Sequence, residues 1–240
     1  MRWCLLLLLA GCASPDAANT RASDEVDASA GRASAEALDR SLLLADVELE
    51  LVRVHGRTPL QEATTSTSRS ALLLAVNAGF FDADVRPLGL ATSRGHSFSA
   101  LDRAMGGGVL WIAGGVGHLD AAEEYRETDV DLALQCRPRL VVGRQNNIRR
   151  DDGVAAARTA LCLRQGGTEL VVVRRVTEDG SGPTLHALAR ELVAMGCEDA
   201  LNLDGGPSVA WAAHDGPWLE PRTPIAMVLV AARKPSAVGR

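Results

Sequence analysis

The sequence predicts an α+β fold, in which a mostly antiparallel mixed sheet carries a few packed helices. Three observations support this class. Strand-like stretches dominate the chain, glycine-rich turns separate several of them, and one stretch has the full pattern of a helix. The 240 residues contain no internal repeat.

The strand-like stretches are of two kinds. Residues 47–54, VELELVRV, alternate apolar and acidic side chains, as a strand with one solvent-facing side does. Residues 71–81 form a continuous apolar run that ends in Asn-Ala-Gly, which is typical of a buried strand that emerges at a turn. The glycine pair at 166–167 predicts a two-residue hairpin. Further strands are expected at residues 108–115, 138–143, 159–165, 169–175, 199–203, 208–213 and 224–233.

One helix is marked at both ends. In GPTLHALARELVAMGC, Thr184 is suited to cap the first turn, and Gly196 is placed to end the helix in a left-handed conformation. Between these two residues, one face of the helix carries Leu185, Leu188, Leu192 and Met195. A second helix is expected over residues 35–45.

The N-terminus resembles a bacterial lipoprotein signal. Arg2 precedes a short apolar run that is too short to span a bilayer, and the run closes on LAGC, residues 9–12. This pattern implies that residues 1–11 are a signal peptide and that Cys12 is acylated. Ala13 in place of Asp favours the outer membrane. The alternative is an ordinary secretory signal with a chance cysteine.

The rest of the chain divides into a tether and one domain. Residues 12–35 are rich in Ala, Ser and Asp, and such a segment buries too little apolar surface to offset its ordering entropy. Residues 36–240 suit a single domain. The net charge of −5 and the scattered basic residues argue against a nucleic-acid partner, and a lipid on Cys12 would make the membrane a partner.

The remaining cysteines and the histidines point to no resident cofactor. Cys136, Cys162 and Cys197 form no CxxC pair, and an exported domain is expected to join two of them and bury the third, with the pairing left open. The five histidines show no HExxH or paired metal spacing. A divalent ion shared with a substrate phosphate also stays open. The glycine-rich stretch 105–118 lacks a P-loop lysine and predicts a hairpin.

The stretch DALNLDGGPSVAW, residues 199–211, has the strongest polar pattern. If it begins as a strand, Asn202 and Asp204 share one face and Leu203 points to the other. Gly205 and Gly206 then allow positive φ angles and close approach of a ligand to the backbone. The alternative is a plain hairpin turn between two apolar strands.

Five stretches resemble, in the right order, segments of the phosphodiester glycosidase domain family. They cover roughly residues 71–232 and are VNAGFFDADVRPLGL, LQCRPRLVVG, ARTALCL, the helix at 183–197 and the ALNLDGGPSVAW motif. This family includes a lysosomal enzyme that removes N-acetylglucosamine from a covered mannose-6-phosphate marker. The resemblance implies a glycan or sugar-phosphate partner and hydrolysis of the bond between an anomeric carbon and a phosphate.

Such a substrate needs groups for its phosphate. Arg158 is the best candidate cation, because a guanidinium grips phosphate oxygens in a bidentate fork. The backbone of Gly205 and Gly206, with Ser208, is expected to form an anion nest. Arg137 is expected to add a phosphate contact or to narrow the site.

The anomeric centre needs a carboxylate, because it develops oxocarbenium character on cleavage. Asp204 is the candidate, as nucleophile, electrostatic stabiliser or proton-transfer group. Asn77 and Asn202 are expected to bind sugar hydroxyls or to orient Asp204. Asp82 and Asp84 are its candidate partners, with a solvated loop as the alternative.

The chain departs from the family pattern near the motif. Gly79 lies in the VNAGFF segment, which follows the family pattern except at Ala78. The resemblance implies that Gly79 contributes to substrate binding. Pro207 replaces a glycine and Val209 a serine or threonine, which removes one N–H and one hydroxyl from the phosphate site. A binding module that recognises an anionic glycan or a protein partner without turnover is therefore the alternative to an enzyme.

Overall fold

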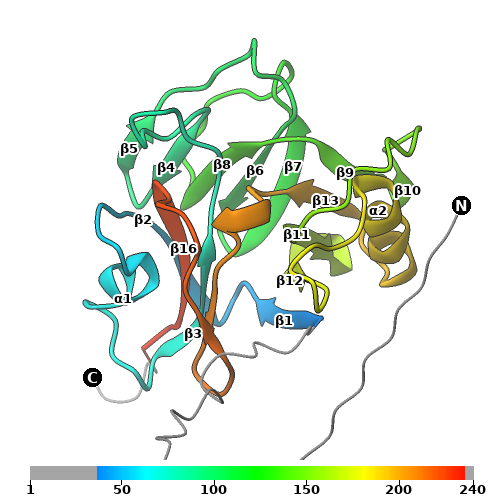
Figure 1. The fold of residues 1–240 in the computed structure, drawn as a ribbon. Coiled ribbons are helices and arrows are strands. Elements are labelled where there is room, and N and C mark those ends of the chain that lie inside the picture. Colours follow the sequence, from blue (N-terminus) through cyan, green and yellow to red (C-terminus); the bar gives the residue numbers. More distant parts are fainter. Residues whose placement is uncertain (1–36, 236–240) are drawn as a thin grey trace, which may run out of the picture. The chain divides into compact units, whose positions relative to one another are not determined.

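Three antiparallel sheets wrap around a common apolar core in the computed structural model, which describes residues 37–235 (Figure 1). Every strand pair in these sheets is antiparallel. The predicted antiparallel sheet is therefore confirmed, but the fold is mostly β, since only two α-helices occur among the described residues. These residues form one compact unit. The predicted signal peptide, Cys12 and tether lie outside them.

The strands are distributed as follows. The six-stranded sheet comprises, in spatial order, β1 (Leu38–Leu43), β12 (Glu169–Arg175), β11 (Arg158–Arg164), β13 (Asp199–Asn202), β9 (Arg139–Val142) and β10 (Gln145–Asn146). One five-stranded sheet comprises β15 (Trp218–Leu219), β14 (Trp211–Ala213), β3 (Leu72–Asn77), β16 (Met227–Arg233) and β2 (Val47–Arg53). The other comprises β5 (His96–Ser99), β4 (Ala91–Ser93), β8 (Leu132–Cys136), β6 (Gly108–Ala113) and β7 (Val116–Ala121).

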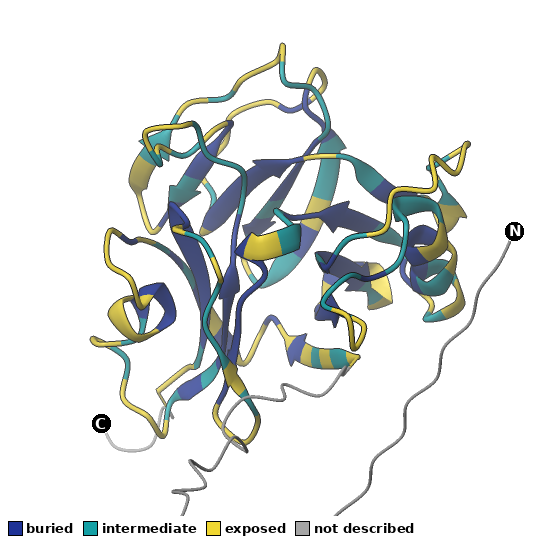
Figure 2. Cartoon of the chain, in the orientation of Figure 1, coloured by how far each residue is buried: buried dark blue, intermediate teal, exposed yellow. Residues whose placement is uncertain are grey.

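The continuous apolar runs are explained by burial on both sides of the sheets. In β11, Leu161 and Leu163 enter the common core while Ala160 and Cys162 pack on the opposite side, beneath a helix. Successive side chains point to opposite faces of a strand, so a strand covered on both faces needs apolar residues at every position. Figure 2 shows the buried residues concentrated on the strands and the exposed ones on the connections.

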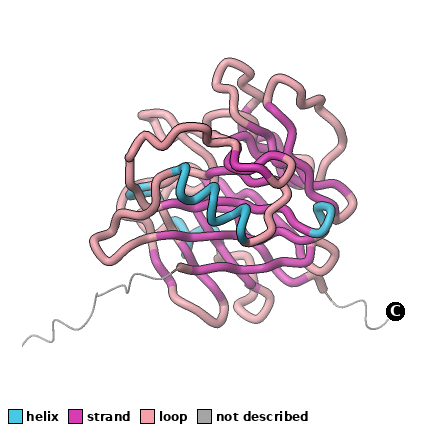
Figure 3. Tube along the Cα trace, turned by 90° about the vertical axis from the view of Figure 1, so that its right-hand side faces the viewer, coloured by secondary structure: helices cyan, strands magenta, loops and turns pink. Residues whose placement is uncertain are grey.

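The predicted helix is confirmed as α2 (Leu185–Ala194), which covers the outer face of the six-stranded sheet (Figure 3). The Thr184 side chain accepts a hydrogen bond from the N–H of Ala187 at 3.2 Å, as an N-cap should. Gly196 has a φ of +84°, the left-handed conformation predicted for the end of the helix. A short helix not predicted from the sequence, α1 (Pro59–Ala63), packs on the sheet that contains β3.

The prediction of a helix over residues 35–45 is wrong, because the structure has the strand β1 within this range. All six residues of β1 pair with β12. Burial alternates along the strand, but Arg40 takes one partly buried position while Leu43 is half exposed. The polar residue on the inner side and the leucine on the outer side hide the two-residue period that would have predicted a strand.

Two further turns differ in detail from their predictions. The glycine pair between β11 and β12 belongs to a 3-10 turn, η1 (Gln165–Gly167), instead of a two-residue loop. Both glycines and Gln165 have positive φ angles. The glycine-rich stretch 105–118 does contain the expected hairpin, formed by β6 and β7 around Gly114 and Gly115.

The structure resolves the pairing that the sequence left open. Cys162 on β11 forms a disulfide with Cys197, which follows α2, and Cys136 on β8 is a buried free thiol. The disulfide ties the helix-to-strand connection to the centre of the six-stranded sheet. Burial raises the pKa of the Cys136 thiol to about 12.

Removing the disulfide with the double substitution Cys162→Ala and Cys197→Ala is expected to lower the free energy of unfolding by about 3–4 kcal/mol. The crosslink spans 35 residues, and closing a loop of that length restricts the unfolded chain by about this amount. Urea unfolding with and without reductant measures the effect. The wild type should lose stability on reduction while the double variant stays unchanged. A wild type that is insensitive to reductant would contradict the prediction.

Candidate active site

The motif at residues 199–211 connects two different sheets. Its first part forms β13, which pairs with β11 and β9, and its last residue begins β14, which pairs with β3 and β15. The interpretation as a plain hairpin is therefore wrong, because the two strands do not pair with each other. Between them lies η2 (Gly206–Ser208), in which Gly206 has a φ of +60°. The crossover exposes a short stretch of backbone next to Asp204.

Asn77, the last residue of β3, holds this crossover in place. Its amide nitrogen donates to the carbonyl oxygen of Asp204 at 2.7 Å. Its amide oxygen accepts from the Thr159 hydroxyl at 2.9 Å and from the Ala210 N–H at 3.1 Å. Asn77 is fully buried and lines no described cavity. Two roles are expected for Asn77, binding a sugar hydroxyl or orienting Asp204. These hydrogen bonds support the second role.

A cavity of about 450 Å³ opens beside Asp204, and we call it the central cavity. It receives side chains from the ends of several strands and from the start of α2. The sequence-predicted residues that line it are Arg137, Arg158, Asn202, Asp204, Gly205 and Gly206. Phe80, Pro138, Ala156 and Leu185 complete the lining. Segments far apart in the sequence thus converge on one hollow.

Asp204 supplies a carboxylate to the central cavity. Its Oδ1 accepts a hydrogen bond from the Gly205 N–H at 2.8 Å, and the Ser208 hydroxyl bonds to the same carboxylate. Burial raises the pKa of Asp204, although the bonds from Ser208 and Gly205 oppose that rise. No ion pair to Asp204 is formed within residues 37–235. A carboxylate with this environment is suited to accept a proton.

Two guanidinium groups line the same cavity. Arg158 donates from Nε to the Pro183 carbonyl at 3.2 Å and from Nη2 to the Val154 carbonyl at 2.9 Å. Burial lowers its pKa, and the nearby Asp152 opposes that effect. Arg137 is exposed, and its Nη1 lies 3.5 Å from the Met105 carbonyl. Both side chains are held by neutral carbonyls, so the cavity carries excess positive charge and suits an anion.

Asn202 presents an acceptor without a partner. Its amide nitrogen donates to the carbonyls of Arg137, at 3.0 Å, and Leu203, at 2.7 Å, which fixes the orientation of the amide. The amide oxygen is buried and has no hydrogen-bond partner in the described structure. An unsatisfied buried acceptor costs about 1–3 kcal/mol.

Two predicted substrate-binding residues lie outside the central cavity. A Cβ at Gly79 would meet Leu134 Cδ1 at 3.3 Å and the Gln135 carbonyl at 3.4 Å, so this glycine lets β8 pack closely. Ser208 is buried, and its hydroxyl is engaged by Asp204. Ser208 therefore positions the carboxylate, while Gly79 is a packing residue.

Asp82 and Asp84 do not approach Asp204. Asp82 Oδ1 accepts from the N–H groups of Asp84 and Arg86, both at 2.9 Å, and Asp84 pairs with the Arg86 side chain. These contacts close an exposed turn, as the alternative of a solvated loop predicted. Asp204 is the only carboxylate that lines the central cavity as described.

Sequence reasoning missed the apolar part of the site. Phe80 lies within the quoted NAGFF segment, and Leu185 is the first residue of α2, but neither is polar enough to stand out as a candidate. The available signal for Phe80 was an aromatic residue directly after Asn-Ala-Gly. Pro138 follows Arg137 through a cis peptide bond, which the sequence does not reveal.

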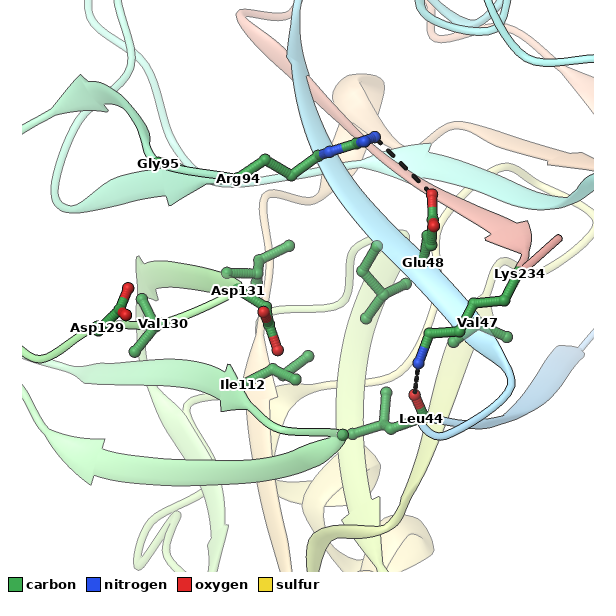
Figure 4. Close-up of a pocket in the computed structure, with 13 residues that line it drawn as sticks. Leu44, Val47, Glu48, Arg94, Gly95, Ile112, Asp129, Val130, Asp131 and Lys234 are labelled. Atoms are coloured by element: carbon green, nitrogen blue, oxygen red, sulfur yellow. Dashed lines mark hydrogen bonds and ion pairs between the residues drawn. The ribbon is translucent and has the colours of Figure 1, made fainter. Parts of the chain in front are cut away.

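A separate cavity of about 400 Å³ contains none of the predicted residues (Figure 4). Its floor is apolar, with Leu44, Val47 and Ile112. Its charged groups are largely bound to the protein itself: Arg94 pairs with Glu48 at 3.9 Å, and Lys234 donates to the Leu44 carbonyl at 3.2 Å. The central cavity, with its unpaired carboxylate, is the better candidate for chemistry.

The three-sheet fold and the central cavity together define a domain of antiparallel sheets with one carboxylate and two guanidinium groups in a single cavity. The chain belongs to the phosphodiester glycosidase family, whose model matches residues 70–232. Within residues 37–235 there is no group of three His, Cys, Asp or Glu side chains that could hold a metal ion, and no helix long and apolar enough to cross a membrane.

Two solved structures share the fold. The catalytic domain of zebrafish N-acetylglucosamine-1-phosphodiester alpha-N-acetylglucosaminidase, auto-inhibited by its pro-peptide, has 18% identity and a TM-score of 0.59, with 81% of each chain covered. A hypothetical protein from Synechocystis has 12% identity and a TM-score of 0.60. That match covers 82% of this chain and 59% of the other, so this chain spans less than two thirds of the Synechocystis protein. No curated protein matches the sequence significantly.

Asp204→Asn is expected to stabilise the folded protein at neutral pH. Because burial raises the pKa of Asp204, the folded state binds this proton more tightly than the unfolded state does. The stability from this group is therefore full below the ordinary value of 3.8 and is lost as the pH rises through the folded-state pKa. The neutral amide removes that loss. Urea unfolding at about pH 3.5 and about pH 7 measures it.

The gain in the free energy of unfolding of Asp204→Asn should be present at about pH 7 and absent at about pH 3.5. Asp46→Asn, at an exposed position outside the central cavity, is the matched control and should change stability by less than about 0.5 kcal/mol. A variant at Asp204 that is less stable than the wild type at neutral pH would contradict the role of burial at this carboxylate.

Proposed function

We propose that this domain hydrolyses sugar 1-phosphodiesters, cleaving the bond between the anomeric carbon and the phosphate oxygen. The observation that carries the proposal is the convergence in the central cavity of the Asp204 carboxylate with two guanidinium groups and the Gly205–Gly206 backbone. A sugar 1-phosphodiester matches all of these groups. Its phosphate is an anion for the guanidinium groups and the glycine backbone, and its adjacent anomeric carbon is electron-poor and suited to lie near the carboxylate. Membership of the phosphodiester glycosidase family supports the same reaction class.

The phosphate is assigned to the basic end of the cavity. Arg158 and Arg137 neutralise it, and the glycine backbone allows its oxygens to approach closely. The sugar ring then lies against Phe80. This arrangement places the anomeric carbon near Asp204.

In the proposed reaction, water attacks the anomeric carbon as the bond to the phosphate oxygen breaks. The carbon gains the water oxygen, the electron pair of the broken bond leaves with the phosphate monoester, and Asp204 takes the proton from water. The raised pKa of Asp204 favours this proton transfer. A phosphate leaves without prior protonation, so one carboxylate is sufficient.

The proposed substrate is a glycan of the bacterial envelope or an exopolysaccharide. This follows from the lipoprotein-like N-terminus, in which Cys12 would carry the lipid and residues 12–35 would link it to the domain. The outer membrane is the proposed location.

Asp204→Asn is expected to abolish hydrolysis while preserving affinity, because the amide keeps the shape of the carboxylate and removes its charge. Released sugar and thermal stabilisation are measured in parallel for a panel of sugar 1-phosphodiesters and nucleotide sugars. Arg158→Ala should weaken binding by about 1.5–3 kcal/mol, the range for a charge-assisted hydrogen bond. Asp46→Asn again serves as the control and should retain activity.

Stabilisation by a ligand without release from either protein would overturn the hydrolase and favour a binding module for an anionic glycan. The loss of one N–H at Pro207 and one hydroxyl at Val209 makes this the second candidate. If no compound in the panel releases sugar or stabilises either protein, sugar phosphates are rejected as ligands and a protein partner is favoured.

Cys12→Ala is expected to move the protein from the membrane fraction to the soluble fraction and to abolish labelling with palmitate. Acylation of this thiol is the only membrane attachment that the proposal uses. Cys4→Ala, within the proposed signal peptide, is the matched control and should leave labelling intact. Palmitate labelling that survives the loss of Cys12 would contradict the lipoprotein assignment.

A further inference from the structure

A second cavity adjoins the central one, and we call it the apolar hollow. It has a volume of about 550 Å³, within the range of about 300–1,000 Å³ typical of ligand pockets. Phe80 and Arg137 line both cavities, so the two meet at these side chains. The remaining lining residues of the hollow are Phe81, Leu88, Asp102, Ala104 and Met105. The hollow therefore begins at a guanidinium that the proposed function assigns to the phosphate.

The lining of the hollow is mostly apolar, in a chain with few aromatic residues. The whole sequence contains only three phenylalanines, and two of them, Phe80 and Phe81, lie here. Leu88 is 41% exposed and is one of the few large apolar side chains among residues 37–235 that solvent reaches to this extent. Apolar surface that is exposed beside a candidate binding cavity indicates contact with an apolar group of the ligand.

The polar groups around the hollow bond mainly to the protein itself. Asp102 Oδ1 accepts from the N–H groups of Ala104, at 2.9 Å, and Met105, at 3.1 Å. The Leu88 N–H donates to a backbone carbonyl at 2.9 Å. Arg137 is the only lining residue with a positive charge, and its Nη1 lies 3.5 Å from the Met105 carbonyl. The hollow thus offers one cation at its entrance and hydrocarbon surface beyond it.

Gln135 on β8 fixes one wall of the hollow before any ligand binds. Its amide oxygen accepts from the N–H groups of Leu90 and Asp102, both at 3.0 Å. Its amide nitrogen donates to the carbonyls of Asp102, at 2.6 Å, and Gly106, at 3.0 Å. The side chain is fully buried, so these bonds hold the loop 102–106 against the sheet. A wall that is already ordered lowers the entropy cost of binding.

We propose that the apolar hollow binds the hydrocarbon chain of a lipid alcohol, so that the substrate is a sugar 1-phosphodiester whose phosphate is also esterified to a lipid. This inference rests on the proposed function and names the substrate class of the same site. Such a molecule carries one anionic group between a sugar and a chain. That order matches one guanidinium, Arg137, between a polar cavity and an apolar one.

The reaction keeps the balance of the proposed function. Water adds its oxygen to the anomeric carbon, Asp204 takes the proton, and the electron pair of the broken bond leaves with the phosphate. The products are the free sugar and a lipid phosphate, whose chain stays in the hollow until the product dissociates.

The test measures how kcat/KM of the full chain depends on the length of the alcohol. The substrates are the methyl, butyl and hexyl diesters of N-acetylglucosamine 1-phosphate. The protein is purified in digitonin, a detergent without an alkyl chain that could fill the hollow. Complete burial of one methylene strengthens binding about fourfold, so each added methylene that enters the hollow should raise kcat/KM about two- to fourfold.

Three variants connect this gain to the hollow. Leu88→Ser should lower the hexyl-to-methyl ratio of kcat/KM about fivefold, because it removes apolar surface that the longer chain covers. Ala104→Trp, at an exposed position of the loop 102–106, should lower the same ratio by filling the hollow. Leu43→Ser is the matched control and should keep the wild-type ratio, because Leu43 is 50% exposed on β1 and lines neither cavity.

Two further comparisons identify the source of the chain. The decyl and geranyl diesters contain equal numbers of carbon atoms, so a preference for geranyl supports a prenyl alcohol and a preference for decyl supports a straight chain. The methyl diester of N-hexanoylglucosamine 1-phosphate carries its chain on the sugar instead. If this compound shows the gain of the hexyl diester and loses it in Leu88→Ser, the hollow binds a substituent of the sugar and the lipid alcohol is wrong.

Other results would also overturn the inference. Equal kcat/KM for the methyl and hexyl diesters in the wild type would show that the hollow takes no part in recognition. A ratio that is unchanged in both Leu88→Ser and Ala104→Trp would place the chain elsewhere. A ratio that falls as far in Leu43→Ser as in Leu88→Ser would show an effect that is not specific to the hollow.

Failure of the proposed function has a different signature. If the wild type releases sugar from none of the diesters, the hydrolase is rejected, and calorimetry with methyl phosphate and hexyl phosphate then tests the hollow alone. Binding of hexyl phosphate that is at least about fivefold tighter, with the difference lost in Ala104→Trp, would support a site for a lipid phosphate. Equal affinities would reject the hollow as well.

Discussion

The side chain of Asn77 joins the parts of the fold on which the site depends. It is the last residue of β3, and it bonds to the Asp204 backbone, to Thr159 on β11 and to the segment before β14. Two sheets and the crossover between them therefore meet at one buried amide. An amide is suited to this position because it offers a donor and an acceptor with a fixed orientation. A shift of either sheet would break at least one of these bonds and move the Asp204 backbone.

The crossover itself requires residues without side chains. Gly206 donates its N–H to the Ala157 carbonyl at 2.8 Å, and a Cβ at Gly205 would lie 2.7 Å from that same oxygen. The crossover thus packs directly on the backbone that leads into β11, and Arg158 is the first residue of that strand. The same close approach that excludes a side chain at Gly205 brings the guanidinium and the carboxylate into one cavity.

Features encoded locally could be predicted from the sequence, whereas those set by tertiary contacts could not. The cap at Thr184 and the left-handed Gly196 act within a few residues, so the limits of α2 followed from the pattern. The grouping of Arg137, Arg158 and Asp204 came from the family resemblance, since these residues are far apart in the chain. The structural role of Asn77 depends on partners 82 to 133 positions away and leaves no local signal. The strand β1 was misjudged because its partner, not its own pattern, decides its conformation.

The central cavity retains groups that folding alone would not favour. The Asp204 carboxylate is partly desolvated without a cation beside it, the Asn202 oxygen is buried without a donor, and two guanidinium groups face the same space. The desolvated carboxylate and the buried amide oxygen each cost stability in the folded protein. Under the proposed function, the phosphate of a bound sugar phosphate would compensate the charges of Arg137 and Arg158, and Asp204 would accept a proton from the attacking water. A purely structural role would leave them unexplained, because apolar residues could fill the same space without the cost. The Asp204 carboxylate, which has no ion pair among the described residues and lies in one cavity with two guanidinium groups, is therefore the strongest physical argument for the proposed reaction site.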